Sequence, residues 1–152
     1  PESVIIRTSW VFSERQNNFV HKVLHLARTQ PSLTVVSDQV GCPTFAPDLA
    51  AAALRITQDA GLRSRIRGGL LHLAGGNPVS RSDFARAIIQ VGVDEGVLGQ
   101  MVPVVETTSD RFVTAARRPL HCILDTSQAE ALGIELNRWD ASLPLAVRAA
   151  RR

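Results

Sequence analysis

Short apolar segments alternate with longer amphipathic stretches along the whole of this 152-residue sequence. The first is the run Val4-Ile5-Ile6, which has no polar alternation and is typical of a strand buried on both faces of a parallel sheet. Further strand-like runs begin at Leu33 and Leu70. Strands separated by helices predict an α/β fold with parallel strands. In such folds ligands bind at the carboxyl ends of the strands.

The stretches between these runs carry apolar residues at helical spacing. In residues 17–31 the paired asparagines suit an N-cap, and Pro31 ends the helix. In residues 77–92, Ser80 and Asp83 fit a capping box. The other expected helices are residues 48–61, capped by Asp48 and stopped by Gly61, and two short ones in the tail, the first from Thr126 or Ser127 to Gly133 and the second from Asp140.

The remaining segments are expected to be extended or irregular. Residues 33–47 predict a short strand followed by a loop rich in Gly and Pro. Residues 68–76 predict a strand between two Gly-Gly turns. Residues 101–108 predict an extended segment, and residues 109–125 predict a polar, proline-broken loop that leads into a short apolar run.

Length and composition describe an ordinary globular domain. A chain of this size buries roughly 68 to 70% of its unfolded surface, and 45% hydrophobic with 20% charged residues is unlike a disordered or fibrous chain. No apolar run approaches the roughly 18 to 20 residues that cross a bilayer, and the first residues lack a signal-peptide pattern. We therefore expect a cytoplasmic protein without a membrane partner.

Several function classes find no support in the residues present. The formal charge of +3 comes from scattered arginines, because Lys22 is the single lysine, and aromatic residues make up 5%. This argues against a nucleic-acid surface, which would want a basic stripe with stacking aromatics. His21 and His25 lie on one expected helix without the Glu of a zinc-protease motif, and Cys42 and Cys122 have no ligand spacing, so no metal is expected.

Catalytic motifs are likewise missing. The chain has no Gly-x-Gly-x-x-Gly or Walker loop to cradle a phosphate. It contains no tyrosine, so it cannot carry a Tyr-Lys proton-transfer pair. We expect no catalytic residue and no cofactor-binding residue within these 152 positions.

Three features are candidates for a binding site, each with a plainer alternative. Trp10 follows the first strand and is either a core anchor or a ligand-facing ring. The loop from Asp38 to Thr44 is either an ordinary turn or a ligand loop in which glycine lets the backbone come close. Arg117 and Arg118, before a proline, are either solvated charges or bidentate partners for a diphosphate.

Together these motifs resemble one family. The most specific are Arg7 to Val11, Asn17 to Phe19, the Asp-Gln-x-Gly-x-Pro-Thr of Asp38 to Thr44, and the Arg-Arg-Pro with a following Leu-Asp in residues 117–125. In order and spacing they are similar to the second half of the dTDP-4-dehydrorhamnose reductase family, within the extended short-chain dehydrogenase/reductase superfamily. That family reduces dTDP-4-dehydro-L-rhamnose to dTDP-L-rhamnose with NADPH.

The resemblance implies a specific architecture. Residues 1–152 are expected to be a single unit, the carboxy-terminal part of a Rossmann-like fold with its last parallel strands and a small substrate-binding domain. In the family the glycine-rich NADPH loop and the catalytic Tyr-x-x-x-Lys precede this part. The 152 residues alone are therefore expected to be inactive, and NADPH is expected to bind mainly to the preceding half.

The resemblance also implies the site residues. Trp10 matches the tryptophan that contacts the deoxysugar of a bound dTDP-sugar. Asn18, Gln39 and Arg118 match positions that look onto the sugar-nucleotide pocket, and Arg118 is the candidate for the diphosphate.

The sequence also departs from the family pattern. Phe12 stands where the family commonly has tyrosine, Arg81 and Ser82 stand where a Trp-Tyr pair often occurs, and Cys122 replaces a usual serine. Two alternatives stay open: a non-catalytic regulatory or interaction member of the superfamily, and another nucleotide-sugar epimerase or reductase. Because exposed sheet edges invite pairing with another chain, a homodimer is also expected.

Overall fold

Parallel strand pairs organise the chain, as the alternation of strands and helices predicts. The computed structural model describes residues 3–15, 17–112, 116 and 118–151. The strands in this part are β1 (Ile5–Arg7), β2 (Val11–Phe12), β3 (Leu33–Val36), β4 (Val40–Gly41), β5 (Thr44–Phe45), β6 (Leu70–His72), β7 (Val79–Ser80), β8 (Val104–Thr107) and β9 (His121–Cys122). The pairs β1–β6, β2–β5, β3–β8 and β4–β9 are parallel, and β4–β7 is antiparallel. The α/β prediction is confirmed.

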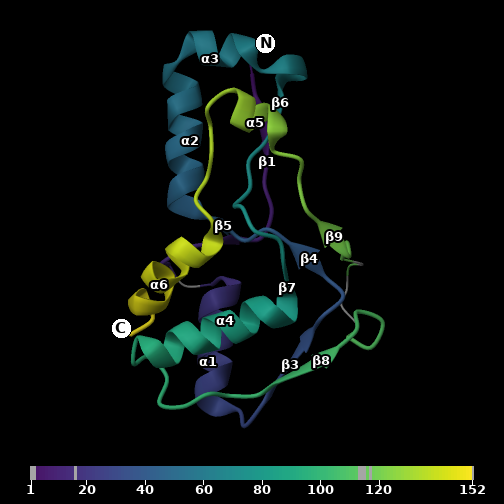
Figure 1. Cartoon of the computed structure of the whole chain (residues 1–152), viewed down its shortest axis with the longest axis vertical. Coiled ribbons are helices and arrows are strands. Elements are labelled where there is room, and N and C mark those ends of the chain that lie inside the picture. The colour runs from purple at the N-terminus through teal and green to yellow at the C-terminus, as the bar shows by residue number, and fades with distance from the viewer. Residues whose placement is uncertain (1–2, 16, 113–115, 117, 152) are drawn as a thin grey trace.

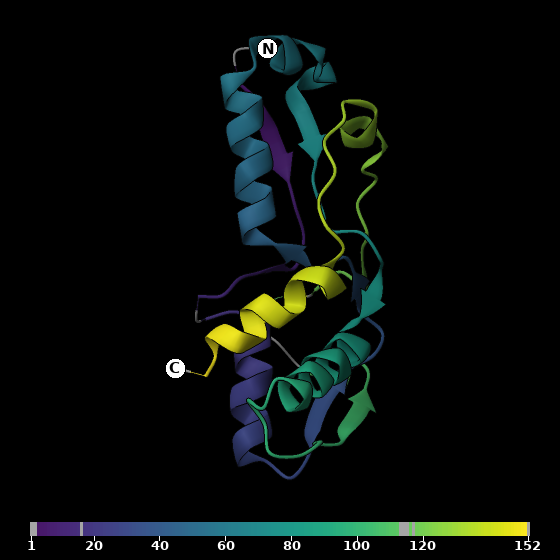
Figure 2. The same ribbon diagram turned by 60° about the vertical axis from the view of Figure 1, so that its left-hand side comes forward.

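The helices divide between two ends of an elongated molecule (Figure 1). They are α1 (Phe19–Thr29), α2 (Ala46–Gln58), α3 (Ala60–Arg65), α4 (Arg81–Asp94), α5 (Ser127–Ala131) and α6 (Trp139–Ala149), with a single 3-10 turn over Arg67–Gly69. Helices α2, α3 and α5 accompany β1 and β6 at the upper end, whereas α1, α4 and α6 lie at the lower end with β3 and β8 (Figures 1 and 2).

Each end has its own hydrophobic cluster. The upper cluster is centred on Ile56, Leu71 and Leu73, which are almost completely buried. The lower one packs α1 and α4 against α6 and contains a run of aromatic rings. In that run Phe84 lies 5.9 Å from Phe12 and 5.2 Å from Trp139, between ring centroids. Phe12 is 1% exposed, so its apolar ring belongs to this core.

Two of the caps expected from local sequence, at Asn18 and at Ser80, are confirmed. Asn18 Oδ1 accepts hydrogen bonds from the backbone N–H groups of Val20 and His21 at the start of α1. Ser80 Oγ accepts from the backbone N–H of Asp83, and the Ser80 hydroxyl donates to the Asp83 carboxylate at 2.7 Å. These hydrogen bonds satisfy donors that a helix leaves open at its first turn.

The expected bounds of the second helix are wrong at both ends. Helix α2 starts at Ala46, and Pro47 lies in its first turn, where a proline is tolerated. Asp48 also lies in that turn and therefore does not cap the helix. At the other end Asp59 interrupts the helix and its side chain accepts the N–H of Leu62, which starts α3. The predicted stop at Gly61 therefore lies inside α3. An aspartate competes with the helix for backbone donors, and here it restarts one.

Burial of the first strand is also corrected. Ile5 is 64% exposed, although its run has no polar alternation. Ile5 and Arg7 are exposed while Ile6 is half-buried, so one face of β1 is open, and among the described strands β1 pairs with β6 alone. An apolar run shows that a strand is suited to burial. Whether its side chains are buried depends on which other segments pack over them.

Smaller differences concern the loops and the tail. The loop expected after β3 contains the strands β4 and β5. Thr126 occupies the N-cap of α5 without a capping hydrogen bond from its side chain, and α6 starts one residue before Asp140. Arg117 and residues 113–115 lie outside the described residues. Within the described part, no helix is both long enough and apolar enough to cross a membrane.

Candidate functional site

Trp10 lies at a sharp turn just after the carboxyl end of β1. Its φ angle is +46°, in the left-handed region that a bulky residue adopts only at a cost of about 1 to 2 kcal/mol. The turn is tied to the loop beyond β4: the Trp10 carbonyl accepts the Thr44 N–H at 3.2 Å, and the Ser9 hydroxyl donates to the Cys42 carbonyl at 3.1 Å. Strain of this kind persists only where surrounding contacts fix the backbone.

Both faces of the Trp10 ring are covered by other residues. A Cβ atom at Gly41 would lie 2.7 Å from Cε2 and 3.0 Å from Cδ2 of Trp10. These two atoms are shared by the two rings of the indole, so the Gly41 backbone lies against a ring face. The guanidinium carbon of Arg81 lies 3.6 Å from the ring centroid. Because the three atoms nearest to the Gly41 Cβ site all belong to Trp10, the guanidinium lies over the opposite face.

Arg81 is the most unusual charge in the structure. Its guanidinium also lies 4.8 Å from the ring of Phe19, so it is in contact with two aromatic side chains. Within the described part of the chain it forms no ion pair and donates no side-chain hydrogen bond. Burial, and to a smaller extent the positive charge of Arg118, lowers the pKa of Arg81 to about 10. A desolvated cation without a counter-charge costs free energy, which the two aromatic faces offset only in part.

An open cavity of about 1660 Å³ lies beside this cluster. Asn18, Gln39, Arg81 and Arg118 all line it, together with much of α1 and β3. Its volume exceeds the range of about 300 to 1,000 Å³ that is usual for small-molecule sites, so a ligand of nucleotide-sugar size would fill only part of it. Trp10 is not among the lining residues and reaches this wall through Arg81.

Gln39 is held by a network that fixes the cavity wall. Its side-chain N–H donates to Ser109 Oγ at 3.0 Å, and the Ser109 hydroxyl donates to Asp38 at 2.8 Å. The Ser109 N–H also donates to Asp38, and this hydrogen bond is the main reason that the pKa of Asp38 is lowered. The Gln39 backbone carbonyl accepts the N–H of Arg81, so the loop and the start of α4 are joined directly.

The other two expected site residues, Asn18 and Arg118, also line the cavity. The side chain of Asn18 is fully engaged in local structure: its oxygen caps α1, and its N–H group donates to the carbonyls of Ser13 and Arg15. It lines the cavity but has little capacity left for a ligand. Arg118 is exposed at the cavity wall and forms no ion pair with a described residue.

The sequence patterns did not point to Arg81 or Ser109 as site residues. Arg81 directly follows the serine cap of α4 and attracts attention only as a departure from an aromatic pair. Ser109 sits at the start of a polar loop without any motif. Metal chemistry has no donor set in the described residues, which contain no group of three or more His, Cys, Asp or Glu side chains placed to hold an ion.

Comparison of the sequence with known protein families identifies the family of this chain. The sequence profile described as "RmlD substrate binding domain" matches residues 1–152. The chain belongs to the RmlD substrate-binding-domain family. This match confirms the resemblance that the motifs indicate, and the cavity and its arginines belong to an RmlD-type domain.

Two relatives of this RmlD-type domain are named as reductases. A dTDP-4-dehydrorhamnose reductase of Aggregatibacter actinomycetemcomitans is 40% identical over 146 residues, covering 94% of this chain and 49% of that protein. One from Sinorhizobium fredii is 38% identical over 149 residues, covering 93% and 48%. The chain thus spans about half the length of the curated relatives it matches.

Solved structures give the same result for the fold. A dTDP-4-dehydrorhamnose reductase from Clostridium acetobutylicum superposes with a TM-score of 0.78 at 31% identity, covering 93% of this chain and 46% of that one. The enzyme of the same name from Bacillus anthracis, in complex with NADP, superposes with a TM-score of 0.79 at 26% identity, covering 92% and 46%. The RmlD-type domain here therefore has the fold of about half of an extended short-chain dehydrogenase/reductase.

Proposed function

We propose that this chain is the sugar-nucleotide-binding part of a dTDP-4-dehydrorhamnose reductase. The whole protein would reduce dTDP-4-dehydro-L-rhamnose to dTDP-L-rhamnose with NADPH, in the cytoplasm, as a step of dTDP-rhamnose biosynthesis. The observation that carries the proposal is the cavity that Gln39, Arg81 and Arg118 all line, in a chain of the RmlD substrate-binding-domain family. An amide beside two guanidinium groups suits a ligand that has both hydroxyls and phosphates.

The part that this chain takes in the reaction is binding and orientation. NADPH, when bound, supplies the hydride for the sugar carbonyl. The chain has no tyrosine and no glycine-rich phosphate loop, so its own residues neither donate the proton in the family's manner nor cradle the cofactor. Arg118 would meet phosphate oxygens, and Gln39, fixed by Ser109, would present its remaining amide capacity to the sugar or base.

The proposed contact between Trp10 and the deoxysugar is constrained by the geometry. Gly41 and Arg81 cover the two ring faces, so the sugar reaches Trp10 at a ring edge as the structure stands, or at a face once Arg81 moves. Asn18 keeps a place at the rim of the pocket, with a structural role as the cap of α1.

A calorimetric titration with dTDP-rhamnose tests the proposal on the protein that carries this sequence. We expect binding by the wild type and weaker binding by Trp10→Ala, because removal of the ring disturbs one wall of the site. Unchanged affinity in Trp10→Ala would remove Trp10 from the site. Tighter binding of a uridine or guanosine diphosphate sugar would favour another nucleotide-sugar reductase or epimerase.

The expectation of inactivity has its own experiment. The 152-residue chain, mixed with NADPH and the 4-keto sugar nucleotide, should show no oxidation of NADPH in an absorbance assay, because it lacks the family's Tyr-x-x-x-Lys. Steady NADPH oxidation by this chain alone would refute the proposal that these 152 residues bind the substrate without catalysing its reduction.

A further inference from the structure

The charge on Arg81 has no partner in the described part of the chain. Its guanidinium lies on the Trp10 ring at 3.6 Å and near Phe19 at 4.8 Å, and no carboxylate or carbonyl of the described residues accepts its five N–H donors. Folding therefore places a partly desolvated cation against two aromatic rings. A group that accepts those hydrogen bonds would recover part of the lost solvation free energy.

A second guanidinium faces the same cavity. Arg118 lies close enough that its charge lowers the pKa of Arg81, so the two cations repel each other across the wall. The carboxylates on this wall do not offset them: Asp38 accepts both hydrogen bonds of Ser109, and neither Asp38 nor Asp110 forms an ion pair with either arginine. Two neighbouring cations without an anion match a ligand that carries two adjacent negative charges.

The support under Arg81 is itself packed from behind. The backbone of Gly41 lies against one face of the Trp10 indole, so close that a Cβ atom there would come within 2.7 Å of the ring, and the Arg81 guanidinium lies over the other face. A guanidinium held over an aromatic face loses part of its rotational freedom, and Arg81 lines the cavity from this position. Lysine, with a flexible point charge, would not keep this geometry.

We propose that Arg81 binds the diphosphate of the ligand together with Arg118, and that Trp10 is a positioning residue that holds Arg81 for this contact. The inference deepens the proposed function, because it identifies the part of a nucleotide sugar that this wall recognises. It goes beyond the family resemblance, which places an aromatic pair at residues 81 and 82 and assigns nothing to an arginine there.

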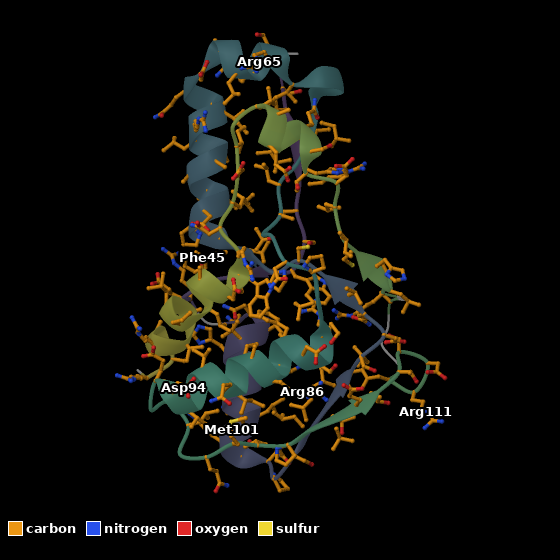
Figure 3. All side chains as sticks on the ribbon, in the orientation of Figure 1. Phe45, Arg65, Arg86, Asp94, Met101 and Arg111 are labelled. Carbon is orange, nitrogen blue, oxygen red and sulfur yellow. The ribbon has the colours of Figure 1, made fainter. Side chains whose placement is uncertain are left out.

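Inorganic pyrophosphate is the probe for the two-arginine site, since it has neither base nor sugar. In calorimetric titrations of the protein that carries this sequence, Arg81→Gln and Arg118→Gln should each bind pyrophosphate about 10- to 100-fold more weakly than wild type. The matched control is Arg65→Gln, an exposed arginine of α3 at the opposite end of the molecule (Figure 3), which should leave the affinity unchanged. No measurable binding by the wild type, or equal binding by Arg81→Gln, would overturn the site.

A double-mutant cycle tests the positioning role of Trp10. If Trp10 acts through Arg81, then Trp10→Ala weakens pyrophosphate binding in the wild type but adds nothing in the Arg81→Gln background. Trp10→Phe, which keeps an aromatic face, should retain most of the affinity, and Arg81→Lys should not. Independent, additive losses would show that Trp10 does not act through Arg81. Circular dichroism and the urea midpoint of each variant check that it folds.

Failure of this inference can be told apart from failure of the proposed function. Binding of pyrophosphate through Arg81 without binding of dTDP-rhamnose would keep the arginine pair and refute the sugar nucleotide as ligand. Binding of dTDP-rhamnose with equal affinity in wild type and Arg81→Gln would support the sugar nucleotide as ligand and refute the role of Arg81 in binding its diphosphate.

Discussion

Gly41 lies so close to the Trp10 indole that a Cβ atom there would come within 2.7 Å of Cε2. We expect Gly41→Ala to force the ring away from its support and to cost about 1 to 3 kcal/mol of unfolding free energy, as overpacking usually does. Urea unfolding followed by circular dichroism measures the stability, and tryptophan fluorescence reports the displacement of the ring.

Gly99→Ala is the matched control for this substitution, because nothing lies within 4 Å of the added methyl group there. It should leave both the urea midpoint and the fluorescence nearly unchanged. Equal effects of the two substitutions would contradict the close packing of Gly41 on Trp10.

Thr44 joins the loop after β4 to the segment after β6 through one buried hydroxyl. Its Oγ1 donates to the Cys42 carbonyl at 3.2 Å and accepts the Gly75 N–H at 3.1 Å. Thr44→Val keeps the shape but removes the acceptor of the buried Gly75 N–H, whereas the Cys42 carbonyl keeps the hydrogen bond from Ser9, so the substitution should cost about 1 to 3 kcal/mol in urea unfolding. Thr57→Val, at an exposed helical position, should change stability by less than about 0.5 kcal/mol.

Asp38 makes the cavity wall sensitive to acid. Because hydrogen bonds from Ser109 lower its pKa below the ordinary 3.8, its contribution is complete above that value and is lost as the pH falls through the lowered pKa. The amide resonance of Ser109 should therefore stay constant from neutral pH down to the ordinary Asp range and shift only below it. In Asp38→Asn this titration should vanish, and a midpoint at or above 3.8 in the wild type would contradict the assignment.

Local sequence predicted the caps at Asn18 and Ser80 correctly because such a cap depends on residues within one turn, whereas the expected cap Asp48 lies inside the first turn of α2. Asn18 and Ser80 each form their capping hydrogen bonds within three residues along the chain. Helix α2 was harder, since the pattern could not show that Pro47 would enter its first turn or that Asp59 would start a new helix.

The candidate site depends on contacts between distant segments, and this limited what the sequence could predict. The position of Trp10 after a strand was informative, but the covering of its ring requires residues 41 and 81 to meet it in space. Gln39 was named from its motif, whereas Ser109, which holds it, comes from a loop 70 residues away. The exposure of Ile5 likewise depends on which segments cover its face of β1, and the apolar run alone does not show this.

A sugar nucleotide is proposed to bind at the cavity wall lined by Gln39, Arg81 and Arg118. Isothermal titration calorimetry with dTDP-rhamnose on the protein that carries this sequence tests it most directly, with Arg118→Gln beside the control Arg65→Gln. We predict binding by wild type and Arg65→Gln, and about 10-fold or greater loss in Arg118→Gln, as expected for a charge-assisted hydrogen bond. No binding by the wild type, or the same dissociation constant in all three proteins, would contradict the account.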